Sequence, residues 1–151
     1  MKKAQGATEY LIILAVVIII ALIVVAAMGG IPGIGTAANE RASASFWQTA
    51  EMAIPNYALS ANTDTLTLDL RNNKRSTVSL STVDIAGTTA NCEQNSLAAG
   101  QTTNCTVSLS DDYVQGDSFT LDVSIQYTDV ATGAVYTYTG EGHDLIGKAA
   151  Q

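Results

Sequence analysis

The chain has 151 residues, of which 47% are hydrophobic, and its seven Lys and Arg stand against fourteen Asp and Glu to give a formal net charge of −7. This length fits one compact domain plus one long accessory element and shows no sign of two enzyme domains. The acidic balance argues against nucleic acid as a partner, because neutralising phosphates requires a basic face. The composition is also uneven. Residues 11–28 form an unbroken apolar run, whereas the sequence after about residue 61 is rich in Thr, Ser, Asp, Asn and Gly.

The apolar run over residues 11–28 predicts a helix. At ~1.5 Å per residue it is about 27 Å long, close to the roughly 30 Å hydrocarbon core of a membrane. Lys2 and Lys3 precede the run, and no cation follows it until Arg41. The tendency of basic residues to stay inside therefore places the N-terminus in the cytoplasm and the rest of the chain outside. We expect a transmembrane helix in the newly made protein.

A break in this helix is predicted over residues 29–35, because glycines raise the entropy cost of a helix and proline removes a donor. The break residues are Gly29, Gly30, Pro32 and Gly33. A helical pattern resumes at Thr36, a suitable N-cap, and one apolar stripe runs on to Tyr57. Pro55 is expected to kink or end this second, amphipathic stretch.

From about residue 64 the apolar residues alternate with a period of two, which predicts β-strands. A phase slip at Ser81 and Thr82 predicts a β-bulge. At least five strands with short polar connections are typical of a small antiparallel sandwich. The residues that define the strands are Leu66, Leu68, Leu70, Val78, Leu80, Val83, Ile85, Val107, Leu109, Phe119, Leu121, Val123, Ile125, Tyr127 and the stretch 135–139.

The two cysteines, Cys92 and Cys105, lie in one polar segment on the predicted outer side, where thiols oxidise. We therefore expect a disulfide, which for a loop of this size contributes about 3 kcal/mol through the entropy of the unfolded chain. The alternative is two separate thiols. A metal site is a poor alternative, since two sulfurs and the distant His143 do not complete a tetrahedral set of ligands.

Glu9 is a carboxylate at the start of the apolar helix, where burial without a partner costs about 2.5 to 3.5 kcal/mol at the centre of a bilayer. No Lys or Arg inside the helix can pair with it. A cut before Gln5 would create a free α-amino group, which could pair with Glu9 of a neighbouring subunit and set the offset between subunits. The alternative is that Glu9 reaches the lipid headgroups while Lys2 and Lys3 anchor the helix.

The basic leader, the spacing of Gln5 and Glu9, and the apolar run that follows resemble the class III signal peptide of archaeal type IV pilins. The resemblance implies that a prepilin peptidase cuts between Ala4 and Gln5 and leaves the helix on the mature protein, with Glu9 near its new N-terminus. The sequence departs from the family where Ala4 and Ala7 replace the frequent Gly and Ser. The segment 29–35 is similar to the melted helix of pilins, and the β-rich part to their immunoglobulin-like heads.

An ordinary secretory signal peptide, cut after residues 25–27, is the main competing interpretation. It fits less well, because the apolar run exceeds the usual 7 to 15 residues.

Three other polar features have weaker interpretations. Asn104 begins the only Asn-x-Ser/Thr sequon, which predicts N-glycosylation on the outer side, with an unmodified asparagine as the alternative. Asp111, Asp112 and Asp117 could bind Ca²⁺ but match no fixed calcium-loop spacing, and a solvated loop explains them as well. His143 has no nucleophile pattern near it, so no catalytic role is expected.

Together these features predict an α+β fold, with a long N-terminal hydrophobic α-helix followed by an antiparallel, immunoglobulin-like β-sandwich head. The expected parts are a leader at residues 1–4, the N-terminal helix at 5–60 and the head at 61–151. The resemblance implies a structural subunit of an archaeal type IV adhesion pilus, without enzymatic activity, cofactor or metal. Its precursor would lie in the cell membrane, and its mature form would polymerise with copies of itself into an extracellular filament. Its other partners would be the prepilin peptidase and the pilus assembly machinery.

Two alternative functions remain open from the sequence. One is a membrane-anchored, monomeric extracellular binding domain, and the other is a filament subunit similar to an archaellin.

Overall fold

The computed structural model describes residues 2–27 and 34–151, with side chains over residues 8–24 and from 35 onward. The chain divides into two compact units, Met1–Ala38 and Asn39–Gln151. Helix α1 (Lys2–Ala27) belongs to the first unit, and helix α2 (Ile34–Thr49) begins there and continues into the second.

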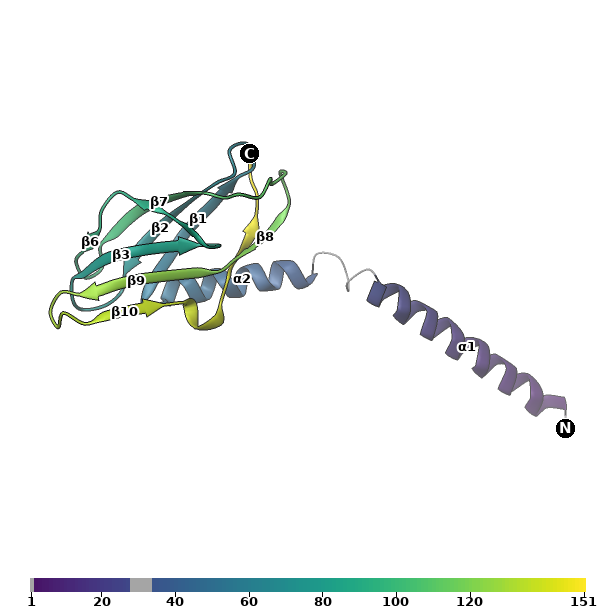
Figure 1. Ribbon diagram of the computed structural model, residues 1–151. Helices are drawn as coiled ribbons and strands as arrows, with labels where there is room; N and C mark the ends of the chain where they lie inside the picture. The colour runs from purple at the N-terminus through teal and green to yellow at the C-terminus, as the bar shows by residue number, and fades with distance from the viewer. Residues whose placement is uncertain (1, 28–33) are drawn as a thin grey trace. The chain divides into compact units, whose positions relative to one another are not determined.

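The second unit is built from antiparallel β-strands (Figure 1). One sheet has the order β1-β2-β7-β5, a second has β10-β9-β3-β4 with β6 also paired to β3, and a small third sheet pairs β11 with β8. The elements are β1 (Met52–Ser60), β2 (Thr65–Asn72), β3 (Val78–Ile85), β4 (Thr88–Thr89), β5 (Asn91–Cys92), β6 (Ser96–Leu97), β7 (Thr102–Ser108), β8 (Ser118–Leu121), β9 (Val123–Asp129), β10 (Val135–Tyr138), the 3₁₀ turn η1 (Gly140–Gly142) and β11 (Leu145–Lys148).

The period-two pattern of the sequence is confirmed in the central strands. Leu66, Leu68 and Leu70 of β2 are buried, while the residues between them are exposed or half-buried. In β3 the register shifts between Leu80 and Thr82, so the predicted bulge is confirmed. These strands bury one face each because alternate side chains point to opposite sides of a sheet.

The long stretch of alternating apolar residues from Phe119 to Tyr127 forms two strands instead of one. Phe119 and Leu121 belong to β8, which pairs with β11, whereas Val123 begins β9, which pairs with β3. Asp122 separates them, and its carbonyl accepts the N–H of Ala86 at 3.0 Å. The chain therefore changes sheet at this point without losing its inward-facing apolar residues.

The prediction that residues 36–57 form one helical stretch is wrong. Helix α2 ends at Thr49, and β1 then runs through the region expected to be helical. Met52, Ala53 and Ile54 are fully buried in the sheet, and the register of β1 shifts between Ala53 and Asn56. Pro55 lies within this shift on an edge strand, which is where a residue without an N–H donor is tolerated.

The expected α+β class with a long N-terminal hydrophobic helix is also wrong. Strands make up 43% and helices 26% of the residues that the structure describes with side chains, so the fold is mainly β and antiparallel. The physical reason is that the core is formed by strand side chains from both large sheets. In the part of the chain that the structure describes, no helix has the length and apolarity that crossing a membrane requires.

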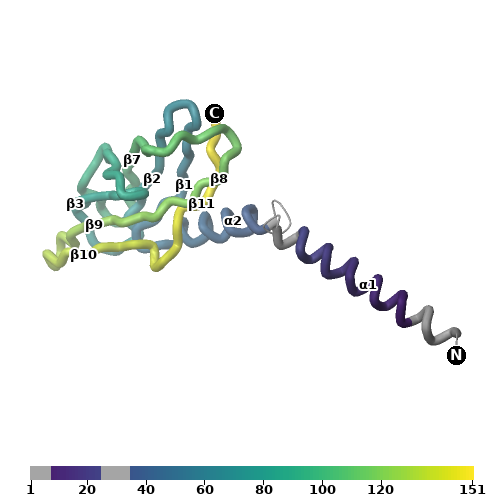
Figure 2. The backbone as a smooth tube through the Cα atoms, turned by 45° about the vertical axis from the view of Figure 1, so that its right-hand side comes forward, coloured from purple at the N-terminus to yellow at the C-terminus, as the bar shows by residue number. Residues whose placement is uncertain are grey.

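The C-terminal half of α2 lies beside the β-strands of the head (Figure 2), and one large aromatic side chain of this half packs into the core. Trp47 is fully buried and belongs to the core, and its indole N–H donates to the carbonyl of Asp144 at 3.2 Å. Ser43, one turn earlier, donates its hydroxyl to the same carbonyl at 2.7 Å. Residues 39–49 are thus part of the head, although the sequence placed them in the N-terminal helix.

Candidate assembly surface

Helix α1 presents apolar side chains to its surroundings all along its described part. Ile19 is 55% exposed and Leu22 is 63% exposed, and their neighbours are similar. Fully burying one such side chain is worth about 1.5–3 kcal/mol relative to leaving it in water. The large exposed apolar residues of α1 are Tyr10, Leu11, Ile12, Ile13, Leu14, Val16, Val17, Ile18, Ile19, Ile20, Leu22, Ile23 and Val24. Contiguous apolar surface of this kind marks a site of interaction.

Glu9 lies on the same helix and is exposed beside this apolar surface. Ala4 and Gln5, the residues that flank the predicted cut, have helical backbone within α1, and their side chains lie outside the described part. The spacing of four residues puts Gln5 and Glu9 about one helical turn apart. The cleavage and the pairing of Glu9 with an α-amino group stay predictions.

The predicted helix break at Gly29, Gly30, Pro32 and Gly33 falls outside the described residues. Gly35, at the end of that segment, is helical and belongs to α2.

The predicted disulfide is confirmed. Cys92 of β5 and Cys105 of β7 are bonded, and they are direct partners in the antiparallel register of the two strands. The bond holds the two-residue strand β5 on the edge of the first sheet. Cys105 is fully buried, so this bond also forms part of the core.

Asn104, the predicted glycosylation site, lies beside Cys105 on the outer face of β7 and is half-buried. Its amide donates to a carboxylate oxygen of Asp69 at 3.2 Å, and Asn56 donates to the other oxygen at 3.1 Å. Modification of Asn104 stays a prediction, and a glycan there would have to replace the first of these hydrogen bonds.

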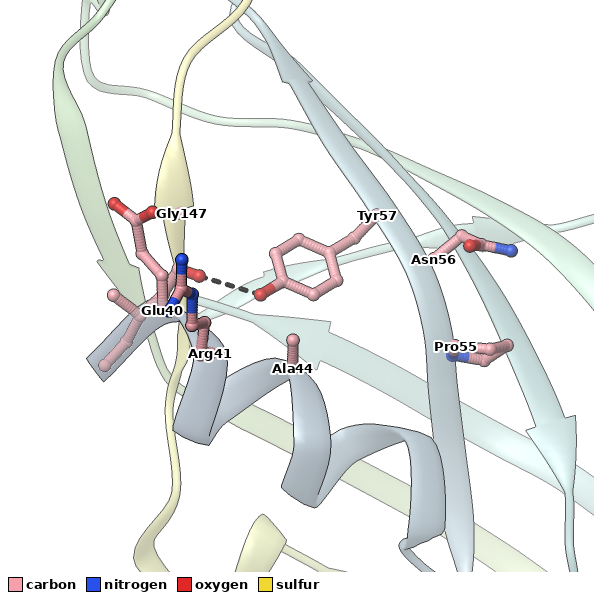
Figure 3. Close-up of a pocket in the computed structure, with 8 residues that line it drawn as sticks. Glu40, Arg41, Ala44, Pro55, Asn56, Tyr57 and Gly147 are labelled. Atoms are coloured by element: carbon pink, nitrogen blue, oxygen red, sulfur yellow. Dashed lines mark hydrogen bonds between the residues drawn. The ribbon is translucent and has the colours of Figure 1, made fainter. Parts of the chain in front are cut away.

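A groove of about 430 Å³ lies between α2, β1 and β11 (Figure 3). Tyr57 of β1 reaches across it and donates its hydroxyl to the carbonyl of Ile146 at 2.7 Å. The N–H of Ile146 donates to the hydroxyl of Ser43 at 3.1 Å. Burial raises the pKa of the Tyr57 hydroxyl. The groove residues are Glu40, Arg41, Ala44, Pro55, Asn56, Tyr57, Ile146 and Gly147.

One side-chain oxygen of Glu40 is buried in this region without a hydrogen-bond partner among the described residues. A carboxylate oxygen held away from water favours a cationic or donor group nearby. The groove therefore offers a polar contact point on the head, next to the hydrophobic stem of Arg41.

A second polar cluster joins the two large sheets near the start of β1. Lys74, after β2, pairs with Glu51 at 2.8 Å and lies over the rings of Tyr127 and Tyr136, with its Nζ 5.3 Å and 4.9 Å from their centroids. Tyr127 donates a short hydrogen bond to Glu51. The lysine hydrogen bond is the main cause that lowers the pKa of Glu51, and burial raises the pKa of Tyr127 to about 12.

Sequence reasoning missed this cluster, because Glu51 and Tyr127 are 76 residues apart and no motif joins them.

His143, for which no catalytic role was expected, stacks on Phe46 with a centroid distance of 3.9 Å. Within residues 8–24 and 35–151, no group of three His, Cys, Asp or Glu is arranged to hold a metal ion, and this includes Asp111, Asp112 and Asp117.

Comparison of the chain with protein-family models gives no match, and comparison with curated proteins gives none either.

Proposed function

We propose that the chain is a structural filament subunit of the type IV pilin kind, which polymerises through α1 and displays its β-sandwich on the outside of an extracellular adhesion filament. The observation that carries the proposal is the exposed apolar surface of α1 over residues 10–24. A protein that keeps such a surface needs partners to cover it, and further copies of the same helix supply a matching apolar surface.

Close packing between copies of α1 is favoured by its small residues. Ala15 and Ala21 lie among large aliphatic side chains on the helix, so neighbouring helices can approach closely at these points. Val and Ile side chains have few rotamers in a helix, so ordering them on assembly loses little entropy. Such packing would place the helices in the filament core.

Glu9 supplies register in this proposal. Inside a bundle of apolar helices a carboxylate needs a cation, and the α-amino group released by cutting before Gln5 lies about one turn away along each helix. Pairing between Glu9 of one copy and Gln5 of the next would fix their axial offset. The peptidase and the assembly machinery of archaeal pili would then be the partners of the chain.

The head suits an exposed position on such a filament. Its disulfide closes the edge of one sheet, and oxidised cysteines persist outside the cell. All acidic residues other than Glu9 follow residue 39, so the charge of the chain is concentrated on the head. A charged surface keeps the filament in solution and away from non-specific contacts.

The test is the production of the chain and its variants in archaeal cells that hold a prepilin peptidase and pilus machinery, with electron microscopy of surface filaments. We expect Glu9→Gln to lower the number of filaments severely, because the charge that pairs with the new amine is lost. Glu93→Gln, an equal change at an exposed position of the head, is the matched control and should assemble normally. Equal filament counts for both variants would contradict the role of Glu9.

A tethered, monomeric binding domain is the second candidate function, and the groove in Figure 3 is the observation that favours it. In that case Arg41→Ala and Glu40→Gln would abolish ligand binding, and the chain would form no filaments when the pilus machinery is present. Filaments that contain the chain would exclude this alternative.

A further inference from the structure

The β9–β10 hairpin carries most of the exposed apolar surface of the head. Outside α1, the large exposed apolar side chains of the described residues are Val114, Val130, Val135 and Tyr136. The last three belong to this hairpin, which lies at one end of the sandwich in both views (Figures 1 and 2). Val130 and Val135 are 58% and 62% exposed. The hairpin is therefore an apolar patch on an otherwise polar head.

The residues of the hairpin itself contribute no surface charge, and Lys74, which lies over Tyr136, is paired with Glu51 at 2.8 Å. Asp129 is the only ionisable acid or base between residues 123 and 139, apart from the tyrosine hydroxyls. Its carboxylate is turned inward, where it accepts the hydroxyl of Ser76 at 2.6 Å and the N–H groups of Ala131 and Thr132 at 2.9 and 3.2 Å. Two copies of an acidic protein repel each other across most of their surface, so an uncharged patch is where they can meet.

Strand β10 has a free hydrogen-bonding edge. The N–H of Asp129 donates to the carbonyl of Ala134 at 2.9 Å, and Tyr136 is opposite Tyr127 two residues along. Hydrogen-bonded and non-hydrogen-bonded pairs alternate in an antiparallel ladder, so the backbone groups of Val135 and Thr137 point away from β9. No other described strand pairs with β10.

The other sheet edges are protected, each by a different feature. Pro55 and a register shift interrupt β1. The N–H of Ala150 donates to the carbonyl of Leu59 at 2.8 Å and so covers part of the edge of β1. The edge of β11 is covered at Ile146 by Ser43 and Tyr57. Strands β4, β5 and β6 have two residues each, and β8 is flanked by Asp117 and Asp122. Short strands, prolines, charges and covers are the usual means of preventing edge pairing.

We propose that β10 pairs in an antiparallel manner with β10 of a second copy of this chain across a two-fold axis. Because the other edges are protected, the edge complementary to β10 is another β10. With Tyr136 on the axis, Val135 of each copy exchanges its backbone hydrogen bonds with Thr137 of the other. The two Tyr136 residues face each other as a non-hydrogen-bonded pair, with their Cα atoms about 4.5 Å apart.

The geometry of the patch is fixed before pairing, which lowers the entropy cost of association. Tyr136 stacks on Tyr127 with centroids 5.6 Å apart, and Lys74 lies over both rings. A two-fold contact closes on itself and makes pairs of heads instead of a chain of them. The β10 contact is therefore separate from assembly through α1. On filaments this contact would join neighbouring heads side by side.

The test uses the full chain in detergent solution with one added cysteine and a mild thiol oxidant, because the two native cysteines are already bonded to each other. Tyr136→Cys is expected to give a disulfide-linked dimer on a non-reducing gel, since a Cα separation of about 4.5 Å permits a disulfide. Val114→Cys, at an exposed valine away from the hairpin, is the control and should stay monomeric. Adding Val135→Lys to Tyr136→Cys should abolish the dimer by placing like charges at the paired edges.

No dimer from Tyr136→Cys, or equal dimer from Tyr136→Cys and Val114→Cys, would overturn the proposal. Thermal unfolding of each variant, followed by circular dichroism, checks that the head is folded. The pairing of heads and the filament proposal can fail independently. If the chain assembles through α1 but the heads do not link, only the β10 pairing is contradicted. If the heads link but no filaments form, only the proposed function is contradicted.

Discussion

The two units of this chain differ in whether their apolar side chains are buried or exposed. In Asn39–Gln151 the large aliphatic residues of β2, β3 and β9 are buried against each other, and few apolar side chains stay exposed. In α1 the described aliphatic residues are exposed. The head therefore holds its stabilising contacts within itself, whereas α1 needs contacts from other molecules to bury its apolar surface.

The largest effect is expected from placing a charge on α1. Ile19→Asp should abolish filament assembly, because a carboxylate would have to be buried without a partner between packed helices. The thermal unfolding of the head should change little, since a change at an exposed position usually alters stability by less than about 0.5 kcal/mol. Filament counts by electron microscopy and circular dichroism measure the two effects.

Val114→Asp is the matched control for this prediction, because Val114 is 68% exposed on the head and lies off both proposed contact surfaces. It should assemble as the unchanged chain does. Normal filaments from Ile19→Asp would show that the apolar surface of α1 is not used for assembly, and the contrast between the two units would then have no functional meaning.

Removing the disulfide tests whether the head holds its stability within itself. Replacing Cys92 and Cys105 together by Ala should lower the free energy of unfolding of the head by about 3 kcal/mol, since the bond closes a loop of 13 residues in sequence separation. Chemical denaturation in urea measures the loss. Reduction of the unchanged chain should reproduce it, and an unchanged midpoint in both experiments would contradict the structural role of the bond.

The packing of α2 against the head is tested by a pair of glycines with similar backbone geometry. Gly140 and Gly133 have φ values of +65° and +71°, so alanine is strained at both, but only at Gly140 would the added Cβ lie 2.5 Å from the ring of Trp47. Gly140→Ala should therefore cost about 1–3 kcal/mol more than Gly133→Ala, the usual range for overpacking a core. Equal losses of thermal stability would show that Trp47 is not held tightly between α2 and the head.

The smallest effect is expected at Glu51, whose pKa is lowered from 4.5 chiefly by the hydrogen bond from Lys74. A lowered pKa in the folded state means that the carboxylate stabilises the head above about pH 4.5 and that this contribution is lost as the pH falls through the lower, folded value. Glu51→Gln should thus flatten the fall in stability on acidification. Denaturation midpoints measured from pH 7 to acid pH, with Glu93→Gln as control, would reveal it, and identical pH profiles for Glu51→Gln and the unchanged chain would contradict it.

Local patterns predicted much of the head, and contacts distant in sequence account for most of the errors. The alternation in β2 and the bulge at Ser81 were predictable because strand faces follow directly from a period of two. Strand β1 was mistaken for helix, since an Ala-rich stretch with Pro55 has no alternation and its strand state depends on pairing with β2. The membrane-spanning helix was expected from the length of the apolar run, and the described residues do not provide it.

The candidate sites divide in the same way. The pairing of Cys92 with Cys105 followed from their number and setting, because two cysteines have only one possible bond. The cluster of Lys74, Glu51 and Tyr127 could not be foreseen, since its members come from two loops and a strand that meet only in the folded head. The free edge of β10 likewise became visible only when the protection of the other edges was known.

The measurement that tests the central proposal most directly is the intact mass of the protein in sheared surface filaments from cells that make this chain together with a prepilin peptidase and pilus machinery. We expect a filament protein that begins at Gln5 and is two hydrogens lighter because of the bond between Cys92 and Cys105. A protein that begins after Ala27, or a filament fraction without this chain, would contradict assembly through α1.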